Sequence, residues 1–133
     1  NSQSYGNTYR LSEAYLNRAE ALVFLGKWES AITDINTIRE KRIKNDYEIT
    51  ATNREDALNK VWEERRRELC FEKHRWFDLR RQGMPELRHI FTNGGSRKEY
   101  ILPTGSKSYT LPIPKKIREQ NKIIVNIERP EQQ

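Results

Sequence analysis

The stretch Val61–Gly83, VWEERRRELCFEKHRWFDLRRQG, decides the fold, because it sets large aromatic side chains among dense charge of both signs. It contains two of the three tryptophans, Trp62 and Trp76. Its charged residues are Glu63, Glu64, Arg65, Arg66, Arg67, Glu68, Glu72, Lys73, Arg75, Asp78, Arg80 and Arg81. A freely solvated helix face does not combine these residue types. The stretch predicts helices packed on both sides, with arginines paired to carboxylates at the edges of a core.

Three glutamates of this stretch recur at every fourth residue: Glu64, Glu68 and Glu72. On a helix they form a column of like charge, which is unfavourable unless cations from another helix meet it. Arg75 and the pair Arg80–Arg81 are the candidate cations. We therefore expect a structural ion network between this helix and the following one. The substitution Glu68→Ala is expected to lower thermal stability.

The arginine triplet Arg65-Arg66-Arg67 invites interpretation as a phosphate clamp, but helical geometry argues against it. Consecutive helical residues point about 100° apart, so three in a row cannot converge on one anion. The spacing instead predicts ion pairs within the helix, from Glu63 to Arg67 and from Arg65 to Glu68.

Part of the stretch resembles the signature near the C-terminal end of the SusD/RagB family. The matching residues are E-R-R-R-E-L at Glu64–Leu69, F-E at Phe71–Glu72 and H-R-W-F-D-L-R at His74–Arg80. Two further segments are similar to the family pattern, AYLNRAEALVFLGKWESAITDIN at 14–36 and L-P-I-P at Leu111–Pro114. The resemblance extends from about Tyr9 to Pro114.

The resemblance implies a role at the cell surface. SusD-like proteins are outer-membrane lipoproteins of Bacteroidetes that bind nutrients, usually glycans, beside a TonB-dependent, SusC-like transporter. We therefore expect a polysaccharide or oligosaccharide ligand, with a peptide as the alternative found in RagB-type members. Neither catalysis nor a cofactor is expected. Localisation is expected at the outer membrane, on the cell surface.

Family members are far longer than 133 residues. We therefore expect this chain to be a C-terminal portion that serves mainly as scaffold and contributes contacts to the transporter. Attachment to the membrane is expected only through a lipid anchor on the missing N-terminal part. The ligand surface of the family is built mainly upstream, so no ligand-binding residue is assigned here.

The balance of charge does not favour a nucleic-acid partner. Lysine and arginine number 25 against 19 acidic residues, a net charge of +6. Acids and bases are interspersed, however, without a long run of one sign. The single cysteine, Cys70, excludes an internal disulfide, and no run of about 18 apolar residues is present to span a membrane.

Apolar periodicity predicts an all-α fold of antiparallel helix pairs with tetratricopeptide-like packing, plus a loop-rich C-terminal region with at most a short β-hairpin. The predicted parts of the single domain 1–133 are a helix pair at about 11–41, a second helix pair at about 53–82 and a closing segment at about 83–133. Gly26, Trp28 and Ala31 have the spacing of a tetratricopeptide unit. A protein–protein interaction module of that type, without glycan binding, is therefore the alternative function.

Two predicted helices show an apolar face with steps of three and four residues. These faces consist of Leu11, Tyr15, Ala19, Leu22 and Val23 in helix 11–25, and of Trp28, Ala31, Ile32, Ile35 and Ile38 in helix 28–41. In a third predicted helix, 53–71, one side is formed by Leu58, Val61, Trp62, Arg65 and Leu69. Thr52 and Glu55 fit a capping box at the start of the third helix. The family resemblance implies a break near Glu72–Lys73, whereas the sequence alone allows one helix through to Arg81. Gly83 and Pro85 end the helical run.

The C-terminal region is predicted to contain short elements between loops. They are one helical turn at Leu87–Phe91, a loop at Asn93–Ser96, a small hairpin of strands 100–102 and 109–111 around a turn at Thr104–Ser106, and a short helix at Lys115–Gln120. Residues 1–9 are polar and aperiodic, which indicates a disordered lead-in or a cut edge.

Side chains able to carry chemistry are sparse. Cys70, His74 and Asp78 follow one another at helical spacing, but zinc requires three or four ligands and no second cysteine exists. Glu86 and His89 have the Glu-x-x-His spacing of di-iron bundles, which need two such motifs. Phosphate-loop, dinucleotide-binding and nucleophile-elbow motifs are missing. No catalytic, cofactor-binding or metal residue is predicted.

Aromatic residues raise the question of sugar stacking. Trp28, Trp62 and Trp76 fall at core positions of the predicted helices, so burial is expected for them. Tyr100 and Tyr109 lie in looser segments, and we expect them to be the better candidates for surface contact.

Overall fold

A computed structural model describes residues 10–121 and 123–125 of the chain. The chain divides into two units, which are described separately. We call Asn1–Arg75 the helical unit and Trp76–Gln133 the hairpin unit. The lead-in expected for residues 1–9 lies outside the described residues.

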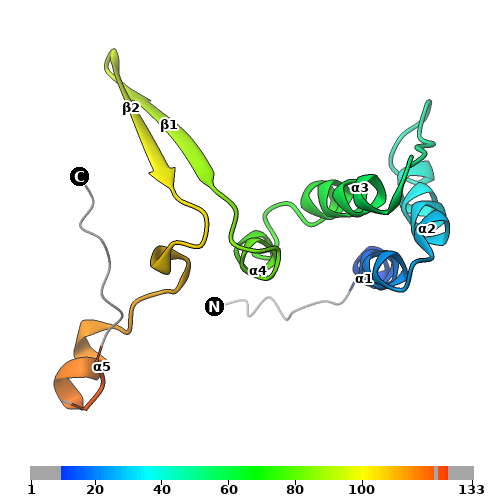
Figure 1. Ribbon diagram of the computed structural model, residues 1–133. Coiled ribbons are helices and arrows are strands. Elements are labelled where there is room, and N and C mark those ends of the chain that lie inside the picture. The colour runs from blue at the N-terminus through cyan, green and yellow to red at the C-terminus, as the bar shows by residue number, and fades with distance from the viewer. Residues whose placement is uncertain (1–9, 122, 126–133) are drawn as a thin grey trace, which may run out of the picture. The chain divides into compact units, whose positions relative to one another are not determined.

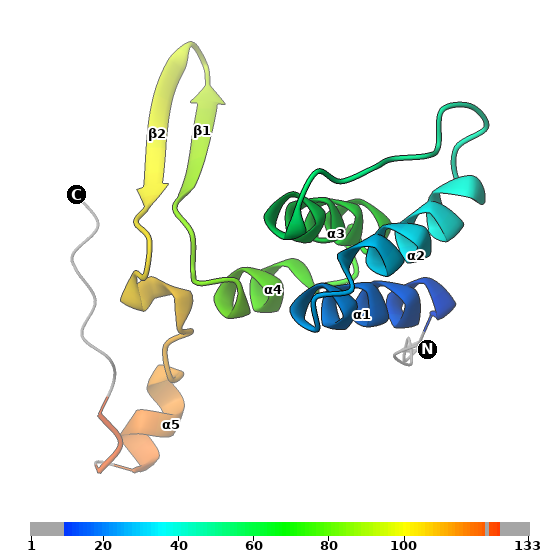
Figure 2. The same ribbon diagram turned by 45° about the vertical axis from the view of Figure 1, so that its right-hand side comes forward.

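The helical unit contains α1 (Leu11–Phe24), α2 (Trp28–Glu40) and α3 (Arg54–Glu68). The helices α1 and α2 form the predicted antiparallel pair, and both contact α3 (Figures 1 and 2). The turn between the paired helices is a Schellman motif: Lys27 N–H donates to Leu22 O at 2.8 Å and Gly26 N–H to Val23 O at 3.1 Å. Gly26 has a φ of 78°, which a glycine adopts without a steric penalty.

The core of the helical unit is formed by small and branched apolar side chains. One cluster contains Ala19 and Val23 of α1, Ala31, Ile32 and Ile35 of α2, and Ala57 and Val61 of α3. A second cluster contains Leu16, Ile38 and Leu69. The predicted apolar face of α2 is confirmed, although Trp28 is only half-buried. On α1 the prediction is wrong at Leu11, which is 75% exposed, because the helix begins there and Leu16 supplies the buried residue one turn later.

The start of α3 differs from the predicted capping box by one residue. Asn53, not Thr52, is the N-cap, and its side chain accepts a hydrogen bond from Asp56 N–H at 2.9 Å. The Asp56 carboxylate in turn accepts from Thr52 N–H at 2.8 Å. The carboxylate of Asp56 thus reaches back to the residue before the N-cap, which is a variant of the predicted capping box with Asp56 in place of Glu55.

The expected break near Glu72–Lys73 is present, but α3 ends three residues before the predicted end at Phe71. The helix ends at Glu68, and α4 (Arg75–Arg81) begins seven residues later. Phe71 and Lys73 adopt φ values of 64° and 66°, a left-handed conformation that a helix cannot continue through.

Beyond α4 the hairpin unit contains β1 (Leu87–Asn93), β2 (Ser96–Leu102), the 3-10 helix η1 (Lys107–Tyr109) and α5 (Lys115–Gln120). The helix predicted at Lys115–Gln120 is confirmed. The helical turn predicted at Leu87–Phe91 is wrong, because these residues pair with β2. The hairpin predicted from strands 100–102 and 109–111 is also wrong, since the partner of β2 precedes it.

The Gly94-Gly95 pair explains this hairpin. Both glycines have positive φ, 54° and 84°, which matches the backbone twist that two-residue hairpin turns require. The strands pair in antiparallel register from Leu87 opposite Leu102 to Asn93 opposite Ser96. Gly105 instead closes a loop, and its N–H donates to Met84 O at 2.8 Å.

The predicted fold class is confirmed. Helices dominate the described residues, and their sheet has two strands. In the part of the chain that the structure describes, no helix is both long and apolar enough to cross a membrane.

Candidate functional site

The signature residues of α3 belong to a network of arginines and carboxylates in the helical unit. Glu64 is buried, with 6% of its side chain exposed, and accepts hydrogen bonds from Arg39 at 3.0 Å and Arg67 at 3.3 Å. Arg39 also donates through Nε to Tyr47 O at 2.6 Å. A carboxylate this far from water is stable only with such partners.

Glu68 is the second carboxylate of the column and is shared by two arginines. Arg42 donates to both of its oxygens, at 3.0 and 2.7 Å, and Arg10 donates to Oε1 at 2.7 Å. These bonds hold the pKa of Glu68 below its ordinary value, with the hydrogen bond from Arg42 as the largest cause and burial opposing it. The hydrogen bond to Glu68 and its negative charge in turn raise the pKa of Arg42. Arg10 also pairs with Glu72, so one arginine joins the last two glutamates of the column.

The predicted ion network therefore exists with other partners. The cations that meet the column are Arg10, Arg39 and Arg42, which come from the residue before α1, from α2 and from the turn after α2. The packing of α1 and α2 against α3 brings these three arginines to the column, while the expected role of Arg75 and Arg80–Arg81 stays a prediction. Arg81 pairs with Asp78 of its own helix, at 2.9 Å.

The two ion pairs predicted within α3 have different outcomes. The pair between Glu63 and Arg67 is confirmed. Arg65 is buried and donates to Asn17 of α1 at 2.7 Å, while its pair with Glu68 stays a prediction. Arg65 thus binds α3 to α1, a role that a helical pattern cannot reveal because the partner lies 48 residues away.

Further polar contacts fix the helices against one another. Arg18 of α1 makes a two-pronged contact with Asp34 of α2, at 2.8 and 2.6 Å. The indole nitrogen of Trp62 donates to Glu20 at 3.0 Å. Trp62 is half-buried, and its polar atom is engaged inside the unit.

A pocket of about 390 Å³ lies beside this network. It is lined by Arg39, Ile43, Ile49, Lys60, Glu63, Glu64 and Arg67. Each of its three cations is already paired with a carboxylate: Arg39 with Glu64, Lys60 with Asp56 at 2.7 Å, and Arg67 with Glu63. The charged side chains that line the pocket therefore neutralise one another, and they help α2 to pack on α3.

The residues considered for catalysis or metal binding are Cys70, His74, Asp78, Glu86 and His89. Cys70 is exposed. Within the described ranges 10–121 and 123–125 no group of three or more His, Cys, Asp or Glu side chains has the arrangement of a metal site. Glu86 precedes β1 and pairs with Arg88 at 2.7 Å, and His89 lies exposed on that strand, so their spacing does not place them on one helix.

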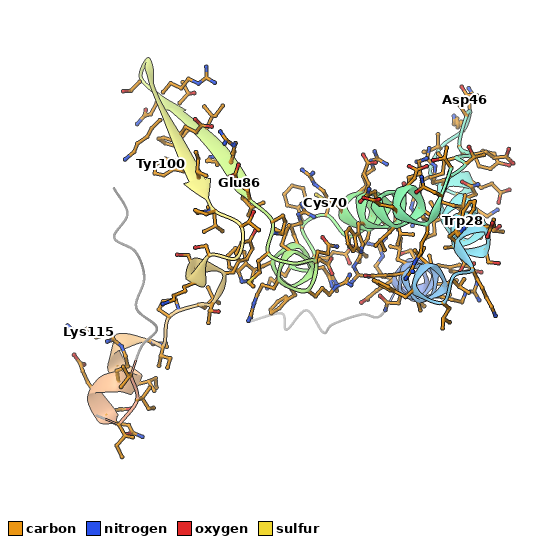
Figure 3. All side chains as sticks on the ribbon, in the orientation of Figure 1. Trp28, Asp46, Cys70, Glu86, Tyr100 and Lys115 are labelled. Carbon is orange, nitrogen blue, oxygen red and sulfur yellow. The ribbon has the colours of Figure 1, made fainter. Side chains whose placement is uncertain are left out.

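The aromatic candidates are distributed differently from the prediction. All three tryptophans are half-buried. The prediction for Tyr109 is wrong: it is fully buried, stacked on Trp76 with ring centroids 5.1 Å apart, and its hydroxyl donates to Pro85 O. Tyr100 is exposed as predicted, at 48%, and the Lys98 ammonium lies 5.0 Å from its ring centroid. Figure 3 shows Tyr100 projecting from β2.

Comparisons with known proteins match this chain to SusD-like proteins. The SusD_RagB model of the SusD family matches residues 1–129. A crystal structure of a SusD-like carbohydrate binding protein from Bacteroides vulgatus superposes with a TM-score of 0.61 at 23% sequence identity. The match covers 86% of this chain and 28% of that protein. No curated protein matches the chain.

The family match includes both α3, with its carboxylate column, and the hairpin unit. The solved structure independently shows the same fold over most of the chain. The chain therefore belongs to the SusD/RagB family.

Proposed function

We propose that this chain is part of a cell-surface nutrient-binding lipoprotein of the outer membrane that works with a TonB-dependent transporter. The observation that carries the proposal is the family match over residues 1–129. SusD-like proteins are generally outer-membrane surface lipoproteins that bind carbohydrate. The ligand we propose is a polysaccharide or oligosaccharide, with the peptide ligands of RagB-type relatives as the alternative.

Within that protein, the chain acts mainly as scaffold and contributes contacts to the transporter. Support comes from the paired charges of the helical unit. Glu64 is paired with Arg39 and Glu68 with Arg42, so these charges are compensated within the helical unit. Such bonds fix helix positions and leave ligand capture to other parts of the longer protein. We propose no catalytic step.

The first test is to locate the native protein. An antibody raised against this chain is used to probe fractions of the source cells. We expect a surface-exposed outer-membrane band that is much heavier than 15.9 kDa and is lost when intact cells are treated with protease. Co-purification of a TonB-dependent transporter supports the partnership. A 15.9 kDa soluble band contradicts the proposal.

Glycan binding is tested on the isolated native protein. It is applied to an array of plant and host polysaccharides, and positive glycans are titrated calorimetrically. Binding to one glycan class supports the carbohydrate ligand, whereas binding to peptides alone supports the RagB-type alternative.

The antiparallel pair α1–α2 favours a second candidate, a tetratricopeptide-like module that binds a protein. Under that alternative the native protein binds no glycan and is recovered with a partner protein that contacts the helical unit. The fractionation and array experiments together separate the two candidates.

A further inference from the structure

The connection between α2 and α3 contains a segment whose main chain is bound by side chains of both helices. This segment, 47–51, runs back along α3 (Figure 2), and we call it the strap. The side-chain amide of Asn36 on α2 exchanges two hydrogen bonds with Ile49: its Nδ2 donates to Ile49 O, and its Oδ1 accepts from Ile49 N–H, both at 3.0 Å. One side chain thus pairs with Ile49 as a neighbouring strand would.

Two cations hold the strap on either side of Ile49. Arg39 of α2 donates to Tyr47 O at 2.6 Å, and Lys60 of α3 donates to Thr50 O at 2.6 Å. Both cations are also paired with carboxylates of α3, so their charges are compensated. Together with the amide of α2, they make four hydrogen bonds to the main chain of the strap. Bonds of this kind recognise a main chain whatever its side chains are.

The side chains of the strap alternate between the core and water. Tyr47, Ile49 and Ala51 are half-buried, whereas Glu48 and Thr50 are exposed. Ile49 and Ala51 pack against the core cluster formed by the three helices. A period of two residues is that of an extended chain. The face of α2 and α3 therefore accepts an extended peptide that has apolar residues at every second position.

The strap leaves space beside it on this face. The pocket of about 390 Å³ described above is lined by Ile49 of the strap and by Ile43, together with charged residues of α2 and α3. A peptide with a bulkier side chain than Ile49 therefore has room there.

We propose that α2 and α3 form a binding site for an extended peptide, and that the strap occupies this site as an autoinhibitory contact. The strap is tethered to both helices, so its effective concentration at the site is on the order of millimolar or higher. A peptide segment of a partner protein competes only when the strap is released. All the contacts lie within the helical unit, and the inference does not depend on glycan binding or on the transporter.

The test uses the full-length protein and a fluorescent peptide with the sequence of residues 45–53, NDYEITATN. The substitution Ile49→Pro in the protein removes the N–H that donates to Asn36 and is expected to release the strap. Peptide binding, measured by fluorescence anisotropy, is expected to be at least tenfold tighter in this variant than in the unchanged protein. The matched control is a peptide that carries Ile49→Pro itself, which is expected to bind the same variant about tenfold more weakly.

Two further measurements keep the test independent of one variant. Circular dichroism reports whether Ile49→Pro is folded, and Ile49→Gly, which retains the N–H but loses the packed side chain, gives the same comparison if it is not. In the unmodified protein, the amide of Ile49 is expected to exchange hydrogen at least tenfold more slowly than the amides of the exposed residues Glu48 and Thr50.

Three results each overturn the proposal: a folded strap variant that binds the peptide no more tightly than the unchanged protein does, equal binding of the two peptides, and equal exchange at the three amides. Glycan binding is measured separately. A protein that behaves as expected in these tests but binds no glycan contradicts the proposed ligand and leaves the strap inference standing.

Discussion

The helical unit and the hairpin unit use their apolar residues in opposite ways. Among the described residues, ten of the twelve buried hydrophobic residues lie in the helical unit, and only Leu79 and Tyr109 lie in the hairpin unit. Of the thirteen large hydrophobic residues that are exposed in those ranges, nine lie in the hairpin unit. The helical unit has a core of its own, whereas the hairpin unit presents apolar surface that is suited to another layer.

Charge follows the same division. The helical unit has 14 basic and 13 acidic residues in its sequence, and the hairpin unit has 11 and 6. In the helical unit arginines compensate buried carboxylates. The hairpin unit therefore carries most of the net charge, and its surface is the more basic of the two.

The largest expected effect tests whether the core is confined to the helical unit. Ile35 is fully buried between the helices, so Ile35→Ala is expected to lower the free energy of unfolding by about 2–5 kcal/mol. The matched substitution Ile117→Ala, at a residue 45% exposed on α5, is expected to change it by less than about 0.5 kcal/mol. Urea unfolding followed by circular dichroism measures both. Equal losses of unfolding free energy in the two variants would contradict a core that is confined to the helical unit.

The next effect tests whether the charges of α3 are structural. Glu68→Ala leaves Arg10 and Arg42 without their shared carboxylate and is expected to cost about 1–3 kcal/mol, with a lower melting temperature. The control is Glu63→Ala, which removes an exposed pair with Arg67 and is expected to cost under about 1 kcal/mol. A melting temperature that is the same for Glu68→Ala and the unchanged chain contradicts the structural role.

Lowering the pH tests the structural role of the Glu68 carboxylate without a mutation. The pKa of Glu68 is lowered in the folded state from an ordinary value of 4.5, so its stabilising contribution is complete above that value. The contribution is lost as the pH falls through the lower, folded-state pKa. Asp56 acts in the same direction, since Lys60 and then Thr52 lower its pKa. The urea concentration at the unfolding midpoint should decrease once the pH is lowered below about 4.5. The decrease should be less steep in Glu68→Ala.

The smallest effect concerns Tyr109, the largest fully buried side chain among the described residues of the hairpin unit. Tyr109→Phe keeps the stack on Trp76 but removes the hydroxyl that donates to Pro85 O, and is expected to cost about 0.5–1.5 kcal/mol. Near-ultraviolet circular dichroism during a thermal melt reports the environment of the stack. Tyr100→Phe, at an exposed tyrosine, should leave that melt unchanged. A loss as large as that of Ile35→Ala would show that the hairpin unit has a substantial core after all.

The sequence predicts the helices well because their burial is one-sided. Ala31, Ile32, Ile35 and Ile38 repeat with helical period, and the helix they predict at 28–41 is observed at Trp28–Glu40. The hairpin is missed for the converse reason. Its two faces are both exposed, so Leu87–Phe91 shows no apolar–polar alternation, and only Gly94-Gly95 signals the turn.

Helical periodicity also cannot identify contacts between side chains that are distant along the chain. The four-residue spacing of Glu64, Glu68 and Glu72 predicts that cations must meet them, yet it cannot say that Arg39 and Arg42, which come earlier in the chain, do so. In the sequence Tyr109 stands in a loop, and its stacking partner Trp76 is 33 residues earlier. Both contacts come from packing between elements that are distant along the chain.

The sharing of Glu68 has a consequence for synthesis of the protein. Arg10 lies 58 residues before Glu68, and Arg42 lies 26 residues before it. A chain that is made from its N-terminus releases both arginines from the ribosome while their common carboxylate has yet to be added. The helices α1 and α2 can pair early through local contacts, but the residue before α1 and the turn after α2 gain their anion only when α3 emerges. Those two segments therefore remain open to proteases until translation has passed the end of α3.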